Sequence, residues 1–263
     1  MPLAPRALGE KTMGDHLGRV SNFVLGNTNG RFLGRRMHRS SFQDMRAQLA
    51  SPRAWSNPLD RAREMSTWAT IVYQMRFGTT PQDQSTYIPG WTLINESDPN
   101  HPADFDALTY EAGGRVVITL EGTTSGREWM LNLATGAYGN DTQMQAAFDY
   151  GRQLANGGAI DGQSIDLTGQ SLGAGLMPLV AAGILDVDPT ANINSLTGFS
   201  TPQFDAQIRG FLASRLDQTE IDHLFNVTEN YVFSGDAIIL PWAGSVLEIR
   251  ILSGACSTKI SRR

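Results

Sequence analysis

The stretch that decides the fold is SIDLTGQSLGAGLMPLVAA, residues 164–182. A short apolar run at residues 165–168 leads into Gly169-Gln170-Ser171-Leu172-Gly173, and an apolar helical pattern follows. The order of strand, sharp turn and helix around G-x-S-x-G predicts a turn that presents a serine hydroxyl at a helix N-terminus. The glycines fit this prediction, because a tight turn leaves no room for Cβ atoms beside the serine.

The pattern of apolar residues on both sides of this stretch predicts strands that alternate with helices. RVVITL, residues 115–120, is the strongest strand, because a β-branched run is typical of a buried strand. Further strands are expected at 87–94, 104–111, 193–198, 231–234 and 246–252, and helices at 58–76, 204–216 and 220–225, with one more helix that Asn140-Asp141 opens and Gly157-Gly158 closes. This alternation predicts an α/β fold, with a mostly parallel central sheet flanked by helices.

Charge divides the chain into two unequal parts. Residues 1–65 carry 11 Lys and Arg against 5 Asp and Glu, whereas the remainder carries 10 against 21. We predict a basic N-terminal extension over residues 1–57 and one α/β domain over residues 58–263, lacking its C-terminal end. Two interpretations of the extension stay open, docking on its own acidic domain or contact with a membrane surface. We expect no nucleic acid partner.

Three further features limit the class of protein. The N-terminus has no apolar core of about 7–15 residues, so we predict no ordinary secretory signal. The longest nearly apolar run, residues 172–185, contains Pro178 and is too short to span a bilayer. We therefore expect a soluble protein, cytoplasmic or exported by a route without a signal. Cys256 is the only cysteine, which excludes an intramolecular disulfide and a thiolate zinc cluster.

The motif around Ser171 has alternative interpretations, because a lone G-x-S-x-G also arises by chance. A phosphate-binding loop would use Gly173 and Gly175, but Pro178 stands at its third glycine position. A second alternative is that Ser171 serves only as a helix N-cap. The strand before Ser171 and the small residues after it favour the nucleophile turn.

Two segments resemble a known family. DLTGQSLGAGL, residues 166–176, resembles the nucleophile elbow of class 3 (fungal-type) lipases and related bacterial phospholipases, usually written GHSLGG. VVITLEGTTSGREWMLNL, residues 116–133, resembles the family's oxyanion stretch, with Glu121 where arginine is usual. The resemblance covers about residues 60–250. It implies an α/β-hydrolase fold and hydrolysis of a lipid or small-molecule acyl ester through an acyl-enzyme, with no cofactor and no metal.

The resemblance also implies roles for four residues. Ser171 would be the nucleophile, and the backbone N–H of Leu172 would be one oxyanion donor. Thr123 would supply the second donor through its N–H and its hydroxyl. NYVFSGDAIILPW, residues 230–242, places Asp236 at the position of the family's catalytic acid. From the residues alone, Thr123 and Asp236 also fit ordinary polar turn positions.

The base of the catalytic triad has no clear candidate. The family order is Ser, Asp, His, but His16, His38, His101 and His223 all precede Asp236. Either the sequence is truncated or altered at its C-terminus, or another group is the base, with His223 the nearest in sequence. The alternative function is a hydrolase-fold protein without catalysis that binds a lipid or a protein partner.

Overall fold

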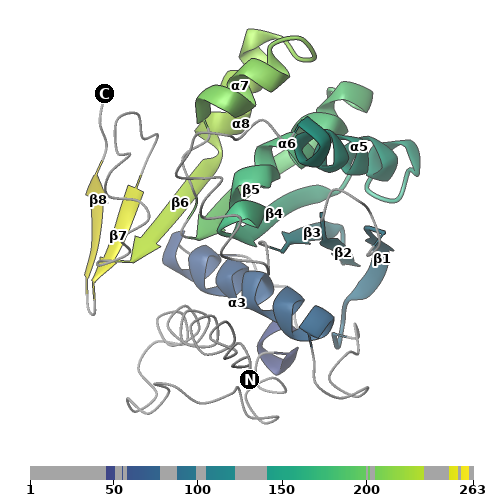
Figure 1. Ribbon diagram of the computed structural model, residues 1–263. Coiled ribbons are helices and arrows are strands. Elements are labelled where there is room, and N and C mark those ends of the chain that lie inside the picture. Colours follow the sequence, from purple (N-terminus) through teal and green to yellow (C-terminus); the bar gives the residue numbers. More distant parts are fainter. Residues whose placement is uncertain are drawn as a thin grey trace, which may run out of the picture.

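The computed structural model describes residues 46–50, 55, 58–77, 88–98, 105–121, 141–199, 201, 205–233, 249–253 and 256–260. One eight-stranded sheet runs through this part of the chain, with helices on both of its faces (Figure 1). The strands are β1 (Thr92–Glu96), β2 (Ala107–Ala112), β3 (Arg115–Leu120), β4 (Ser164–Gln170), β5 (Asn192–Phe199), β6 (Thr228–Phe233), β7 (Ile249–Ser253) and β8 (Cys256–Ile260).

The strands lie side by side in the same order as in the sequence. Neighbours from β3 to β7 are parallel, whereas β1, β2 and β8 join the sheet by antiparallel pairing. Right-handed crossovers between parallel strands that advance in one direction place their connecting helices on one face of the sheet. That face carries α5 (Asp141–Asn156), α6 (Leu172–Val187), α7 (Asp205–Leu212) and α8 (Gln218–Asn226) (Figure 1).

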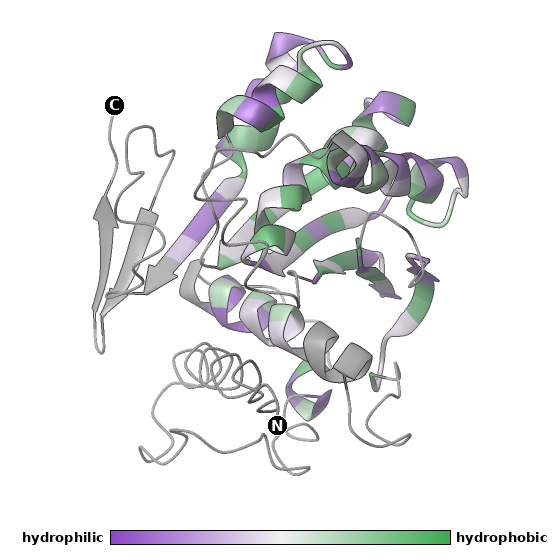
Figure 2. Cartoon of the chain, viewed as in Figure 1, coloured by the Kyte–Doolittle hydropathy of each residue, from purple (hydrophilic) through white to green (hydrophobic). Residues whose placement is uncertain are grey.

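The opposite face of the sheet is covered by α3 (Pro58–Phe77) (Figure 1). Alternate residues of β3 therefore enter two different cores. Ile118 packs with residues of α5 and α6, and Val117 packs with residues of α3. In Figure 2, hydrophobic residues concentrate in α6 and the central strands, while the outer helices α5 and α7 carry more hydrophilic ones. Burial on both faces explains why β3 is a β-branched, mostly apolar run.

The predicted fold class is confirmed, and most of the predicted elements are present. β3 has the predicted bounds, and the long first helix extends one residue further, to Phe77. The helix predicted at 204–216 ends at Leu212, and β8 was not predicted. Leu49 and Trp55, assigned to the extension by prediction, contact the core, since Trp91 Nε1 donates to the Leu49 carbonyl oxygen. The domain boundary at 57/58 stays a prediction.

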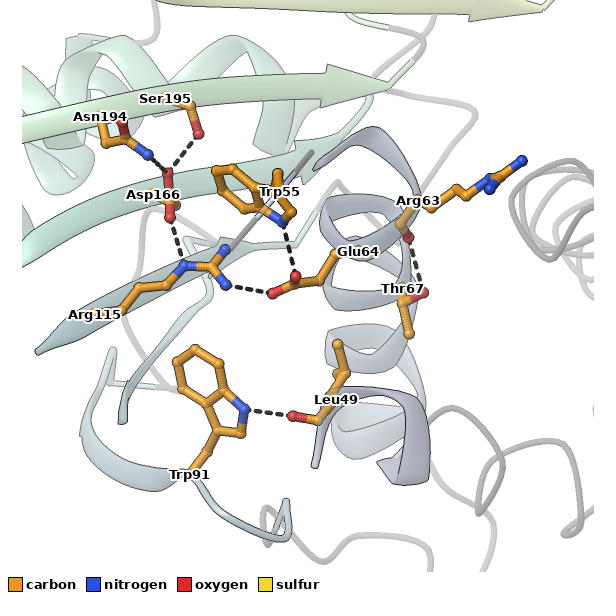
Figure 3. A network of polar contacts seen from close by, with 10 residues as sticks. All are labelled: Leu49, Trp55, Arg63, Glu64, Thr67, Trp91, Arg115, Asp166, Asn194 and Ser195. Atoms are coloured by element: carbon orange, nitrogen blue, oxygen red, sulfur yellow. Dashed lines mark hydrogen bonds and ion pairs between the residues drawn. The ribbon is translucent and has the colours of Figure 1, made fainter. Parts of the chain in front are cut away.

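A network of charged groups fastens α3 to the sheet (Figure 3). Arg115, at the start of β3, bridges two carboxylates: its Nη1 lies 2.6 Å from Glu64 Oε1 and its Nε lies 2.7 Å from Asp166 Oδ2. The fully buried Asp166 also accepts hydrogen bonds from Asn194 and Ser195, at 2.8 and 2.6 Å. These residues lie near the amino ends of β3, β4 and β5, so the network occupies the edge of the sheet opposite to Ser171.

Helices α5 and α6 approach one another through glycines. A Cβ atom on Gly183 of α6 would overlap the carbonyl oxygen of Phe148 in α5. A Cβ atom on Gly151 of α5 would likewise overlap the carbonyl oxygen of Val180 in α6. Each glycine thus packs directly against the backbone of the other helix, which fixes the position of α6 above β4.

We expect Gly183→Ala to lower the free energy of unfolding by about 1–3 kcal/mol, because the two helices must move apart to admit the methyl group. Gly210→Ala in α7 is the matched control, since a Cβ there meets nothing within 4 Å. The control should raise the free energy of unfolding by about 0.5–1 kcal/mol through better helix propensity. Urea unfolding measures both values, and equal stabilities for the two variants would contradict the close packing.

Candidate active site

Ser171 lies in the sharp turn between the end of β4 and the start of α6. Its φ is 51° and its ψ is −122°, and no other non-glycine residue in the described part of the chain has a positive φ. The Ser171 N–H donates to the carbonyl oxygen of Phe199 in β5, at 2.9 Å, and its own carbonyl oxygen accepts from the N–H of Gly175, at 3.2 Å. The neighbouring strand and the first helical turn therefore hold this conformation from both sides.

Two glycines make the turn possible by removing side chains from crowded positions. A Cβ on Gly169 would lie 2.6 Å from the carbonyl carbon of Gly173. A Cβ on Gly173 would lie 2.5 Å from the carbonyl oxygen of Leu120 and 2.7 Å from that of Glu121. The predicted steric need for these glycines is confirmed. The first turn of α6 therefore lies directly against the ends of both β3 and β4.

The hydroxyl of Ser171 does not cap the helix. Ser171 occupies the N-cap position, yet its side chain makes no capping hydrogen bond. The alternative interpretation as an N-cap alone is therefore not supported. The backbone N–H groups of Leu172 and Gly173 precede the first hydrogen bond of α6, which forms between Gly175 and Ser171. Together with the helix dipole, they can stabilise a negative charge that develops beside the Ser171 hydroxyl.

The other two predicted site residues, Thr123 and Asp236, lie outside the described residues. The strands that precede them in sequence are β3 and β6, which end at Leu120 and Phe233. Both strands run parallel to β4 and β5 in one sheet. Their carboxyl ends therefore lie at the same edge as Ser171, which is the edge where open α/β sheets bind ligands.

His223 is not brought to this edge. It is exposed on α8, and its carbonyl oxygen accepts the N–H of Val227, immediately before β6 begins at Thr228. The last turn of α8 therefore lies at the amino end of β6, whereas Ser171 lies at the carboxyl end of β4. Because these strands are parallel neighbours of β5, the two residues belong to opposite edges of the sheet.

Three residues beside the turn were not predicted from the sequence. Gly198 at the end of β5, Thr201 after it and Asn230 in β6 form a compact group next to the residue that accepts the Ser171 N–H. Gly198, inside a predicted strand, was a signal of close packing. The contact of Thr201 with Asn230 offered no signal, because it joins the segment after β5 to β6, 29 positions further along the chain.

Solved structures of fungal lipases are similar to this chain in overall fold. The nonglycosylated LIP2 lipase of Yarrowia lipolytica is 16% identical, with a TM-score of 0.52 over 74% of this chain and 79% of that chain. The fold is the α/β-hydrolase fold of the fungal lipases. The Rhizomucor miehei triacylglyceride lipase gives 14% identity, coverage of 75% and 81%, and a TM-score of 0.49. The Rhizopus microsporus var. chinensis lipase gives 13%, 76% of each chain and 0.47.

Sequence comparison adds no family. The sequence matches no protein-family model, and it matches no curated protein sequence. The likeness to fungal lipases is therefore a likeness of fold, and the predicted resemblance holds at that level. No helix in the described parts of this lipase-like fold is both long enough and apolar enough to cross a membrane.

Proposed function

We propose that this chain is a serine ester hydrolase of lipase or phospholipase type, acting on acyl esters through an acyl-enzyme. The observation that carries the proposal is the positive φ of Ser171, between a buried strand and a buried helix. A non-glycine residue in such a conformation costs about 1–3 kcal/mol, and strain of this kind clusters at active sites. The turn places the half-buried Ser171 beside the first backbone N–H groups of α6, and such N–H groups are the donors that an oxyanion needs in acyl transfer.

In the proposed reaction, the Ser171 Oγ attacks the ester carbonyl carbon while a base takes its proton. The carbonyl oxygen becomes an oxyanion, which accepts hydrogen bonds from the Leu172 N–H and from Thr123. Collapse of this intermediate breaks the ester C–O bond, and the leaving oxygen takes the proton from the base and departs as the alcohol. Water, deprotonated by the same base, then attacks the acyl-enzyme and releases the carboxylic acid and the Ser171 hydroxyl. Asp236 has the role of orienting the base.

The lack of a clear candidate for the catalytic base is the reason for a second candidate function. No histidine follows Asp236 in the 263 residues, and His223 belongs to the opposite edge of the sheet. In a polypeptide of these residues we expect slow turnover, because a triad without one member keeps about 10³–10⁴-fold over water. The second candidate is a hydrolase-fold protein that binds a lipid or a protein partner without catalysis. Under the first candidate function, we propose that the substrate is a lipid or small-molecule acyl ester and that residues 1–57 contact a membrane surface.

Covalent labelling separates the two candidates better than turnover does. A fluorophosphonate reacts with an activated serine hydroxyl, which displaces fluoride and forms a stable phosphonate ester. We expect one phosphonate on Ser171 in the native chain, and none after unfolding in urea, because the turn is then lost. Peptide mass spectrometry identifies the labelled residue.

Ser214→Ala is a suitable control for this labelling. Ser214 is exposed, and its hydroxyl bonds the carbonyl oxygen of Phe211 at 3.4 Å, far from the turn in sequence. The control should be labelled as fast as the unchanged chain. A folded native chain that carries no phosphonate on Ser171 would favour the second candidate function over the first.

A further inference from the structure

A hydrogen bond beside Ser171 joins the exit of β5 to the body of β6. Thr201 Oγ1 donates to Asn230 Oδ1 at 2.7 Å. Thr201 follows the last residue of β5 by two positions, and Asn230 lies in β6 directly opposite Gly198. The side chain of Thr201 is therefore turned back toward the sheet that its own segment has just left.

The bond occupies the space left by the missing side chain of Gly198. A Cβ atom there would overlap Thr201 Oγ1, and would lie 2.6 Å from Asn230 Oδ1 and 3.1 Å from the Cβ of Ala174. Ala174 belongs to the first turn of α6, three residues after Ser171. The Thr201–Asn230 bond is thus packed between β5, β6 and the start of the helix that carries the turn.

Phe199 connects this bond to Ser171. Its carbonyl oxygen accepts the Ser171 N–H, at 2.9 Å. On one side of Phe199, pairing of Gly198 with Asn230 fixes the chain. After Phe199, the hydrogen bond from Thr201 to the same Asn230 fixes the position of the chain. The carbonyl group that holds Ser171 is therefore held between two attachments to one residue of β6.

We propose that Thr201 and Asn230 are positioning residues that hold the Phe199 carbonyl and, through it, the strained turn at Ser171. A positive φ at a non-glycine residue persists only where the surrounding structure enforces it. The consequence for catalysis rests on the proposed function, in which Ser171 is the nucleophile. The positioning of the turn itself does not depend on that function.

A pair of substitutions at one site tests the proposal. Thr201→Val keeps the shape but removes the donor, whereas Thr201→Ser keeps the hydroxyl. Thr228→Val is the matched control, because Thr228 Oγ1 donates to the Leu224 carbonyl oxygen at 2.7 Å at the other end of β6. It removes a similar bond from the same strand at the opposite edge of the sheet.

Amide hydrogen exchange of the Ser171 N–H, followed by NMR, is the first measurement. Its reference is the N–H of Leu196, which donates to Val227 at the amino end of β6. Relative to that reference, we expect about tenfold faster exchange in Thr201→Val, as for loss of one part-buried hydrogen bond. Thr201→Ser and Thr228→Val should stay within about twofold of the unchanged chain. Unchanged relative exchange in Thr201→Val overturns the proposal, whatever the activity.

The rate of fluorophosphonate labelling is the second measurement. We expect it to fall about tenfold in Thr201→Val, because a small displacement of the nucleophile is costly. Thr201→Ser should restore it. If exchange accelerates but the labelling rate of a reactive chain does not change, the catalytic part of the proposal is wrong. If the unchanged chain is not labelled, the proposed function fails, and the exchange measurement still decides the positioning of the turn.

Discussion

Ser171→Ala and Ser171→Gly are both expected to abolish fluorophosphonate labelling, yet to differ from one another in stability. Neither variant has the Oγ atom that forms the bond to phosphorus, so labelling at this position should fall to background. The backbone at Ser171 has φ 51° and ψ −122°, which glycine adopts without a Cβ clash and alanine does not. We therefore expect the glycine variant to be more stable than the alanine variant by about 1–3 kcal/mol.

Urea unfolding with fluorescence detection measures that difference. The unchanged chain should have the stability of the alanine variant to within about 0.5 kcal/mol, since both have a Cβ atom and the Ser171 hydroxyl makes no capping bond. A glycine variant no more stable than the alanine variant would mean that the turn is not strained. Labelling that persists in either variant would show that another residue reacts.

Arg115→Met is expected to lower the free energy of unfolding by about 3–5 kcal/mol, because it leaves a buried carboxylate without its cation. The side chain of Asp166 is fully buried and that of Arg115 is 13% exposed. Arg115 also forms an ion pair with Glu64 of α3. Its removal therefore weakens the attachment of α3 to the sheet and leaves the Asp166 carboxylate unpaired with a cation. Arg115→Lys should recover only part of the loss, because one ammonium group cannot reproduce the two-sided contact of Nε and Nη1.

Arg152→Met provides the matched comparison. Arg152 Nε lies 3.0 Å from Asp186 Oδ2, but the two side chains are 49% and 29% exposed. Exposed pairs contribute about 0–1 kcal/mol, so this substitution should lower the free energy of unfolding by no more than that. Denaturant unfolding in about 0.15 M salt compares the two. If Arg115→Met and Arg152→Met lower the free energy of unfolding by similar amounts, burial does not determine the contribution of these ion pairs.

The central part of the fold was predictable because local signals agreed with the tertiary structure. RVVITL is apolar on both faces because both faces of β3 are covered, and that pattern marked the strand. The glycines around Ser171 were informative for a similar reason, since the close contact with β3 and β4 excludes a Cβ atom. At these positions, close packing in the folded chain restricts which residues can occupy each site, and that restriction is visible in the sequence.

Element ends were less predictable. The sequence D-Q-T-E at 217–220 forms a capping box, in which the Glu220 N–H donates to Asp217 and the Asp217 N–H donates to Glu220, each at 2.8 Å. This signal was readable, and it places the start of α8 before the predicted one. β6 begins earlier than predicted, at the polar Thr228, which pairs with Leu196 of β5, and the charge of Glu229 is compensated by Arg61 of α3, 2.5 Å away.

The group formed by Gly198, Thr201 and Asn230 was not predictable from periodicity. The Thr201–Asn230 bond joins residues 29 positions apart, and the segment 230–242 was singled out for Asp236, not for Asn230. The location of Ser171 at a turn between strand and helix was predictable, because it depends on consecutive residues. What holds that turn depends on neighbouring strands, which a single sequence does not reveal.

The position of α3 has a consequence for how the chain folds. α3 is the first long helix in the described part of the chain, yet its partners come much later. The Met65 carbonyl oxygen accepts a hydrogen bond from Thr168, 103 residues downstream, and Arg61 pairs with Glu229 of β6. During synthesis, the sheet-facing side of α3 therefore stays uncovered until β4 and β6 have left the ribosome. Contacts of such long sequence separation slow folding and prolong the exposure of apolar surface.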